Sequence, residues 1–155
     1  MAQSLSCQAT VDHREIGARL HAVGIQPTQQ RLAIAQVLLQ APVHLSADDI
    51  LLAARRYLPR LSRATVYNTL PLFVEKGLLR ALRLDAERTV YDSRTDAHFH
   101  LYHEDTGVLQ DMPSEALHWP SIPPIAKHLE MVGIDLIVRV RQRAAEPGLQ
   151  QQASA

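Results

Sequence analysis

The stretch that decides the fold is SRATVYNTLPLFVEKGLL, residues 62–79. Ser62 is a candidate helix N-cap, and Val66, Leu70 and Phe73 recur at the spacing of one helix face. The opposite face carries polar and aromatic side chains of moderate length, the kind that reach phosphates and base edges from a major groove: Arg63, Thr65, Tyr67, Asn68 and Thr69. The segment predicts either a DNA-reading helix or an ordinary solvent-exposed one.

The segments on both sides of this helix predict a winged helix-turn-helix domain. Three shorter amphipathic helices precede it, beginning near Asp12, Thr28 and Ser46. After Gly77, segments 78–85 and 89–92 are predicted as two strands around a tight turn. Helices followed by a hairpin are typical of this DNA-binding architecture.

The remainder of the chain predicts a second, strand-rich domain. Segments 98–103, 107–112 and 134–143 are predicted strands, and 124–133 is a predicted short helix. Three strands and one helix bury too little apolar surface alone, so we expect a homodimer. The fold class is therefore α+β, with an N-terminal winged helix-turn-helix domain and a C-terminal α/β dimerisation domain built on a three-stranded antiparallel sheet. The expected bounds are a flexible N-terminus over 1–11, the DNA-binding domain over 12–92, the dimerisation and metal-sensing domain over 93–143, and a disordered tail over 144–155.

Composition excludes several classes of protein. No apolar run approaches the length of a membrane span and no signal peptide is recognisable, so we expect a cytoplasmic protein without a membrane partner. Cys7 is the single cysteine, which excludes an internal disulfide. Residues 1–93 hold 11 Lys and Arg against 8 Asp and Glu, a net +3, and residues 94–155 hold 5 against 8, a net −3. This asymmetry is compatible with nucleic acid binding by the first half and equally with chance.

Histidines cluster in DAHFHLYHEDTGVLQD, residues 96–111. In a strand, His98 and His100 lie on one face and His103 on the other. Carboxylates in expected reach are Asp92 and Asp111, and one further histidine at an element boundary is His44. This nitrogen and oxygen ligand set suits Fe(II), Mn(II) or Zn(II). The alternative is a histidine pair that only forms hydrogen bonds on a half-exposed strand.

The hypothesis that this segment belongs to an enzyme has less support. HFHLYH superficially resembles the HxHxDH run of metallohydrolases, but it has no aspartate before the last histidine. The chain also shows no nucleophile constellation and no glycine-rich phosphate loop. We therefore expect a protein that is not an enzyme.

Seven short motifs in order resemble the ferric uptake regulator (Fur) superfamily. They are GIQPTQQR, HLSADDI, SRATVYNTL, EKGLL, YD, HFH and GVLQD, and the resemblance runs from about Gly24 to Arg141. It implies a dimeric, metal-responsive transcription factor that binds double-stranded operator DNA. It also implies a regulatory metal site formed by His44, Asp92, His98, His100 and Asp111. Two aspartates in this set resemble the peroxide-sensing branch, where bound Fe(II) drives oxidation of the histidines.

The resemblance also implies where DNA is bound. Base contact in the superfamily comes from the helix that contains Tyr67 and Asn68 here, and the PTQQR segment lies near the DNA backbone. Together with the polar helix face, this predicts a set of DNA-binding residues: Thr28, Arg31, Arg60, Ser62, Arg63, Thr65, Tyr67 and Asn68.

Departures from the superfamily pattern point to one branch. The structural four-cysteine zinc site is impossible, because its first pair of positions holds His103 and Thr106. This pattern is most similar to the iron response regulators (the Irr branch), which couple transcription to iron through haem. Their Cys-Pro motif is missing because Gln8 follows Cys7, so haem would have to be bound by His98, His100 or His103. His103 and His118 are the candidates for binding haem or a secondary metal. The expected function is an iron- or haem-linked repressor. The alternatives are a peroxide-sensing Fe- or Mn-dependent repressor of the same superfamily, or a winged-helix regulator without a metal switch.

Overall fold

The protein is described by a computed structural model over residues 12–116, 124–131 and 134–143. The chain forms two compact units, the first ending at Asp96 and the second beginning at Ala97. The predictions for residues 1–11 and 144–155 lie outside the described residues. Within the described ranges, no helix is both long enough and apolar enough to cross a membrane.

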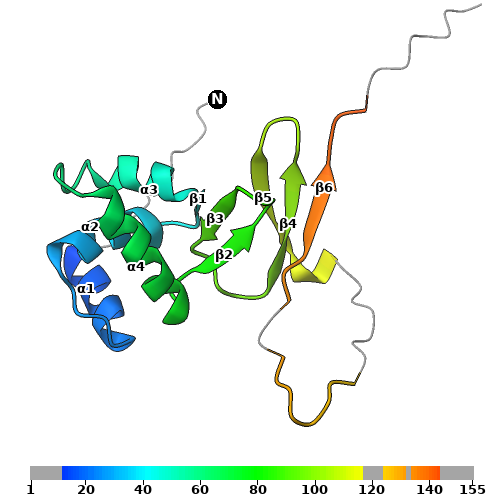
Figure 1. The fold of residues 1–155 in the computed structure, drawn as a ribbon, viewed down its shortest axis with the longest axis horizontal. Helices are drawn as coiled ribbons and strands as arrows, with labels where there is room; N and C mark the ends of the chain where they lie inside the picture. Colours follow the sequence, from blue (N-terminus) through cyan, green and yellow to red (C-terminus); the bar gives the residue numbers. More distant parts are fainter. Residues whose placement is uncertain (1–11, 117–123, 132–133, 144–155) are drawn as a thin grey trace, which may run out of the picture. The chain divides into compact units, whose positions relative to one another are not determined.

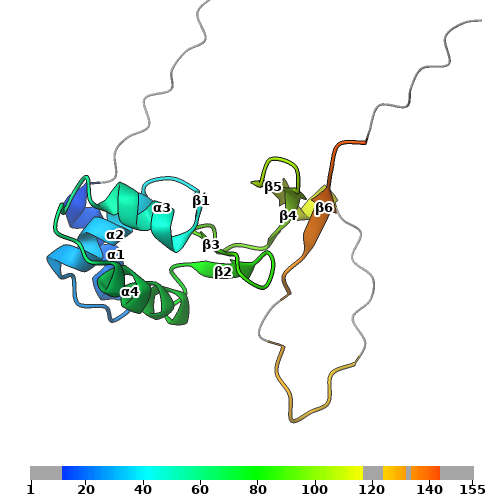
Figure 2. The same cartoon turned by 45° about the horizontal axis from the view of Figure 1, so that its top comes forward.

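The described part of the first unit contains four α-helices (Figures 1 and 2). They are α1 His13–Ala22, α2 Gln29–Leu39, α3 Ala47–Ala54 and α4 Arg63–Glu75. Each helix begins at a side chain that accepts a hydrogen bond from a free N–H of the first turn, and these N-caps are Asp12, Thr28, Ser46 and Ser62. Helix α4 is continuous through Pro71.

Local signals also end the helices where the chain must turn. Gly24 follows α1 with a φ of 77°, and Gly77 follows α4 with a φ of 73°. This left-handed conformation is strained for residues with a Cβ, so glycine ends the helices without that strain. The turn at Gly24 leads into α2, and the turn at Gly77 leads into the strand that begins at Arg80.

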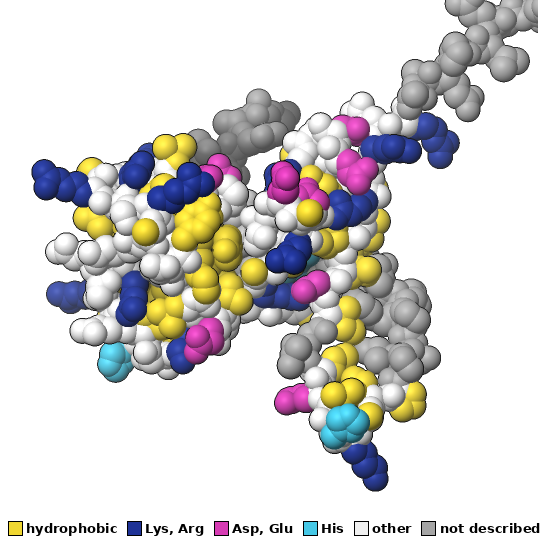
Figure 3. Space-filling view, in the orientation of Figure 1, with side chains coloured by type: hydrophobic (Ala, Val, Ile, Leu, Met, Phe, Trp, Pro, Cys, Tyr) yellow, Lys and Arg dark blue, Asp and Glu magenta, His cyan; other side chains and the backbone are white. Residues whose placement is uncertain are grey.

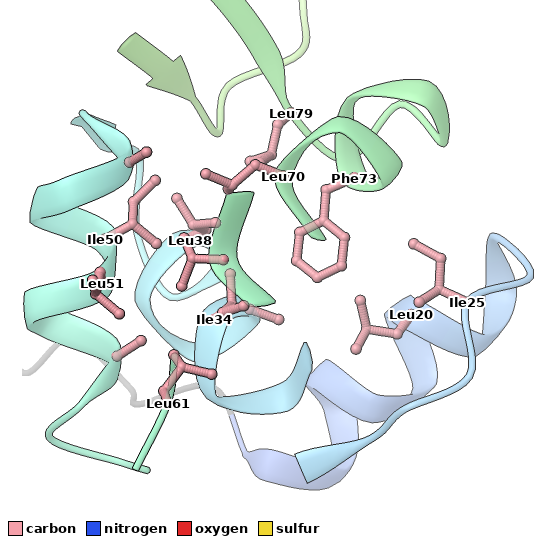
Figure 4. Close-up of a cluster of buried hydrophobic side chains, with 14 of the residues drawn as sticks. Leu20, Ile25, Ile34, Leu38, Ile50, Leu51, Leu61, Leu70, Phe73 and Leu79 are labelled. Atoms are coloured by element: carbon pink, nitrogen blue, oxygen red, sulfur yellow. The ribbon is translucent and has the colours of Figure 1, made fainter. Parts of the chain in front are cut away.

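Side chains from all four helices converge on one core (Figure 4). Phe73, Leu70 and Val66 of α4 are fully buried, as the spacing on residues 62–79 predicts. Leu20 of α1 and Ile50 of α3 are buried with them. Each fully buried side chain of this size contributes about 1.5–3 kcal/mol of transfer free energy. The core therefore fixes α4 with Arg63, Tyr67 and Asn68 turned to solvent. Thr69, expected on the same face, is instead buried, and its hydroxyl donates to the Thr65 carbonyl.

A three-stranded antiparallel sheet completes the described part of the first unit, in the order β1-β3-β2. The predicted hairpin is confirmed as β2 Arg80–Arg83 and β3 Thr89–Asp92. The sequence did not predict β1, a two-residue strand at His44–Leu45 that pairs with the end of β3. Two residues are too few to show an alternating pattern, but this pairing places His44 directly opposite Asp92.

The described part of the second unit is built on another three-stranded sheet, in the order β5-β4-β6. Its strands are β4 His98–His103, β5 Val108–Pro113 and β6 Ile137–Val140, with a short 3-10 helix at Ser114–Ala116. β4 and β5 pair antiparallel as expected, around a turn that ends at Gly107. The α+β fold class with a winged-helix domain is confirmed.

Two details of the second unit differ from expectation. β6 pairs with β4 in parallel, so the prediction of a wholly antiparallel sheet is wrong for this pair. Parallel pairing needs a long connection, and the chain between β5 and β6 is long enough to supply one. The predicted helix over 124–133 is also wrong for the described residues 124–131, which form only a turn. Ile125 and Leu129 stay exposed there, so a short helix would gain no packing energy.

Candidate metal centre and nucleic-acid interface

In the first unit, strand pairing brings together one histidine and one carboxylate. His44 Nε2 lies 3.6 Å from Asp92 Oδ1. The Asp92 side chain is fully buried and the His44 side chain is 15% exposed. The Asp92 carboxylate also accepts a hydrogen bond of 2.7 Å from the Arg94 backbone N–H, which fixes its orientation. The two predicted ligands of the winged-helix domain are therefore neighbours in the fold.

In the second unit, three metal-ligating side chains meet across the β4–β5 pair. His100 lies opposite Asp111 in the strand register, and His98 lies on the same face of β4. The two imidazole Nε2 atoms are 3.0 Å apart. Asp111 Oδ1 lies 3.4 Å from His98 Nε2 and 3.5 Å from His100 Nε2. We call these three residues the donor triangle.

The donor triangle fits a divalent metal ion. Two donor atoms that are each about 2.1 Å from one ion lie about 3.0 Å apart in octahedral and about 3.4 Å apart in tetrahedral geometry. The three separations, between 3.0 and 3.5 Å, lie in or just beyond this range. Both imidazoles are almost completely buried, so their orientation is set by the strands and not by solvent. The donor set has nitrogen and oxygen ligands without thiolate, which suits Fe(II), Mn(II) or Zn(II).

The other histidine candidates are not part of the donor triangle. His103 is half-buried and lies on the other face of β4, as the alternation predicts. His118 lies outside the described residues. The role of His103 and His118 in binding haem or a second metal stays a prediction.

The predicted DNA-binding face lies on the first unit. Ser62, Arg63, Tyr67 and Asn68 are exposed at the N-terminal end of α4, and Thr65 is half-buried beside them. Arg60 is exposed in the turn before this helix. Figure 3 shows Lys and Arg side chains spread over the helical part, with fewer Asp and Glu side chains. A helix that presents these groups has the chemistry for phosphate and base contacts.

A polar cleft with a volume of about 280 Å³ lies between the start of α2 and α4. Its lining includes four residues of the predicted DNA-binding set, Thr28, Arg31, Thr65 and Asn68. Arg31 is fixed there by a hydrogen bond of 3.1 Å from its guanidinium to the Gln26 carbonyl. The structure thus brings the PTQQR segment beside the polar face of α4.

Asp48 also lies on this face, where no sequence pattern predicted it. Asp48 of α3 lies 2.9 Å from Arg63 Nη2, and the same nitrogen lies 3.1 Å from the Tyr67 hydroxyl. The hydrogen bond with Tyr67 and then the charge of Asp48 raise the pKa of Arg63 above its usual value. On β3, the pKa of Tyr91 is raised above its usual value. The main cause is burial of its side chain, and the second is the electrostatic interaction with Tyr67.

Comparisons with known proteins identify a family for this fold. The model of the ferric uptake regulator family matches residues 22–131. The peroxide operon regulator of Bacillus subtilis is 34% identical over 106 residues, covering 68% of this chain and 70% of that protein. The structure of the ferric uptake regulator from Pseudomonas aeruginosa with manganese is 26% identical, with a TM-score of 0.63, over 83% of this chain and 98% of that one. The structure of the Francisella tularensis ferric uptake regulator with iron is also 26% identical. Its TM-score is 0.60, and the match covers 77% of this chain and 93% of that one.

The family match covers more than half of the chain, and the fold is similar to those of the solved ferric uptake regulators. The resemblance to the superfamily is thereby confirmed, while the assignment to the iron response branch stays a prediction. This chain belongs to the ferric uptake regulator family of metal-responsive, DNA-binding transcriptional regulators.

Proposed function

We propose that the protein is a metal-dependent transcriptional repressor that responds to peroxide and uses Fe(II) or Mn(II) as its regulatory ion. The observation that carries the proposal is the donor triangle of His98, His100 and Asp111, with donor separations of 3.0–3.5 Å. The similarity to a peroxide operon regulator supports the hypothesis of a peroxide-responsive repressor over that of a haem-linked repressor. A repressor of this kind acts on DNA in the cytoplasm and needs no enzymatic turnover.

The proposed regulatory site has five ligands. His98, His100 and Asp111 come from the second unit, and His44 and Asp92 come from the first. Each histidine offers one ring nitrogen and each aspartate one carboxylate oxygen. Because the ligands belong to two units, joint binding of one ion would restrict the orientations of the units relative to each other. Restricting the orientations shifts the population toward the state that binds DNA.

The proposed DNA partner is a double-stranded operator bound by a homodimer. Tyr67 and Asn68 would contact base edges, while Arg31, Arg60 and Arg63 would contact phosphates. The remaining members of the predicted set, Thr28, Ser62 and Thr65, lie at the starts of α2 and α4, where they would orient the phosphate contacts. Two copies related by two-fold symmetry would read two half-sites.

The experiment that tests the metal switch measures affinity for promoter DNA by fluorescence anisotropy at fixed salt, first with chelator and then with Mn(II). We expect at least tenfold tighter binding with Mn(II), a coupling free energy of about 1.4 kcal/mol. His98→Ala and His100→Ala should abolish this change. His103→Ala is the matched control because it removes a histidine from the other face of the same strand. A Mn(II) effect that survives in both triangle variants would contradict the proposal.

A second experiment separates the peroxide response from simple metal sensing. A bound Fe(II) ion supplies one-electron chemistry with peroxide beside the imidazoles, and a bound Mn(II) ion does not. The imidazoles of His98 and His100 would be oxidised, because their ring nitrogens would hold the ion. The O–O bond of peroxide, the oxidant, would break, so that one oxygen atom would add to a ring carbon and the other would leave as water. Peptide mass spectrometry after peroxide should therefore find an added oxygen atom on these residues in the Fe(II) protein alone. Unmodified histidines together with unchanged DNA affinity would refute peroxide sensing and leave metal sensing in place.

The second candidate function is an iron-linked repressor that senses haem. It is favoured by the resemblance to the iron response branch and by the position of His103, which is half-buried and separate from the donor triangle. Titration with haem, followed by absorption spectroscopy, tests this function. A shifted Soret band that is lost in His103→Ala would support it, and an unchanged band would exclude it.

A further inference from the structure

We propose that Ser93 is a positioning residue for metal binding, which holds His44 beside Asp92 at the separation that a shared ion requires. This role rests on the proposed metal-dependent function and belongs to a side chain outside the set of five ligands. No contact between Ser93 and the ion is needed, because Ser93 acts by fixing the backbone segment that leads into His44.

The two proposed ligands of the first unit depend on a very short strand pairing. β1 contains only two residues, and its pairing with β3 places His44 opposite Asp92. His44 Nε2 lies 3.6 Å from Asp92 Oδ1. Two donors of one ion lie about 3.0–3.4 Å apart, so the observed separation is only slightly longer. A functional site must be held within about 0.5 Å of its working geometry, and a two-residue strand needs further support to achieve this.

Ser93 supplies this support by continuing the strand pairing one residue beyond β3. Its backbone N–H donates to the Val43 carbonyl over 3.2 Å. A regular antiparallel pair would return a bond from the Val43 N–H to the Ser93 carbonyl, but this N–H donates to Ser93 Oγ over 3.0 Å. The Ser93 hydroxyl in turn donates to the Ala41 carbonyl over 3.3 Å. One side chain therefore fixes the backbone on both sides of Pro42, directly before His44.

The neighbouring residue fixes the other ligand. The Arg94 N–H donates to Asp92 Oδ1 over 2.7 Å, which is the hydrogen bond of an Asx turn. Regular pairing of β3 ends at Asp92, and the Ser93 hydroxyl accepts the bond that a backbone carbonyl would otherwise accept. Ser93 is half-buried, so water competes less for its hydrogen bonds than at an exposed site. Two consecutive residues thus orient the two ligands, Arg94 through its backbone and Ser93 through its side chain.

The test compares the Mn(II) dissociation constants of the wild type and Ser93→Ala, in the full chain and without DNA. Free Mn(II) is measured by electron paramagnetic resonance during titration. Without the hydroxyl, the Val43 N–H loses its acceptor and the segment before His44 is released. We expect Ser93→Ala to raise the dissociation constant about tenfold, the lower end of the loss seen when residues that support metal sites are changed. Ser93→Thr keeps the hydroxyl on a strand-forming residue and should bind Mn(II) like the wild type.

Two controls separate positioning from a general loss of stability. Thr89→Ala removes a hydroxyl from the other end of β3 and should leave the dissociation constant unchanged. In a His44→Ala background, Ser93→Ala should have no further effect, because the ligand that it positions is gone. Thermal melts with chelator verify that each variant is folded.

Four results would overturn the inference. They are an unchanged dissociation constant in Ser93→Ala, an equal rise in Thr89→Ala, a Ser93→Thr protein that binds as weakly as Ser93→Ala, and a Ser93→Ala effect that persists without His44. A wild-type protein that binds no Mn(II), or binds it equally well after His44→Ala, would contradict the proposed five-ligand site itself. Failure of the Ser93 role alone is recognised by weaker binding in His44→Ala together with unchanged binding in Ser93→Ala.

Discussion

Asp111→Asn should weaken metal binding while preserving the shape of the site. The Asp111 side chain is 21% exposed, and its Oδ1 atom lies 3.4 Å and 3.5 Å from two imidazole nitrogens. Asparagine keeps one oxygen and the side-chain volume but removes the negative charge. Loss of a ligand charge of this kind should raise the metal dissociation constant by about 10- to 100-fold, the loss seen when residues that support metal sites are changed.

The expected stabilisation by Mn(II) follows from the linkage between metal binding and folding. At a Mn(II) concentration of 100 times the dissociation constant, the wild-type protein gains about 2.7 kcal/mol of stability. With a dissociation constant 10- to 100-fold higher, the gain at the same concentration falls to about 1.4–0.4 kcal/mol. In a chain of this size 1 kcal/mol shifts the midpoint of thermal unfolding by about 2–4 °C. Mn(II) should therefore raise the midpoint by about 5–11 °C in the wild type and by about 1–6 °C in the variant.

Thermal unfolding followed by circular dichroism, with chelator and with Mn(II), measures both shifts. Each protein is compared with its own metal-free form, so any direct effect of the substitution on stability cancels. Glu115→Gln is the control, because Glu115 is an exposed carboxylate of the same unit in the short 3-10 helix. The same Mn(II) shift in wild type and Asp111→Asn would refute the assignment of Asp111 as a ligand.

Three further predictions concern the first unit. Ser46→Ala removes the capping box with Asp49 and should lower the free energy of unfolding by about 1 kcal/mol in urea titrations, and an unchanged urea midpoint would contradict this. Gly77→Ala places a Cβ in open space at a φ of 73°, so backbone strain alone should reduce stability by about 1–2 kcal/mol; a gain in thermal midpoint would exclude this strain. Asn68→Ala should reduce discrimination at one base pair by about 1–3 kcal/mol in competition binding to single-substituted duplexes, and an unchanged preference would remove Asn68 from base contact.

Local sequence signals predicted the first unit well because its helices depend on nearby residues. The caps Thr28, Ser46 and Ser62 each accept a hydrogen bond from an N–H three residues ahead, so a short window of sequence contains the whole signal. The stripe of Val66, Leu70 and Phe73 was enough to predict which face of α4 is buried. The pairing of His98 and His100 on one face also followed from strand periodicity alone.

Features that join distant residues could not be predicted in this way. Periodicity gives the faces of β6 but not its direction, and the parallel pairing with β4 depends on the long connection. The pairing of His44 with Asp92 joins segments 48 positions apart through a strand of two residues. The contact of Asp48 with Arg63 has no periodic signature, because it depends on how α3 packs beside α4.

The order of pairing in the second unit has a consequence for how the chain folds. β4 and β5 are joined by a four-residue turn, whereas the β4–β6 register pairs His103 with Val140. Closing the longer loop costs about 2 kcal/mol more chain entropy than closing the turn. Hairpins form in about 1–10 microseconds, so we expect β4 and β5 to pair before β6 is added. His98, His100 and Asp111 all lie on that hairpin, so the metal donors would assemble early in folding, and an ion could then accelerate the steps that follow.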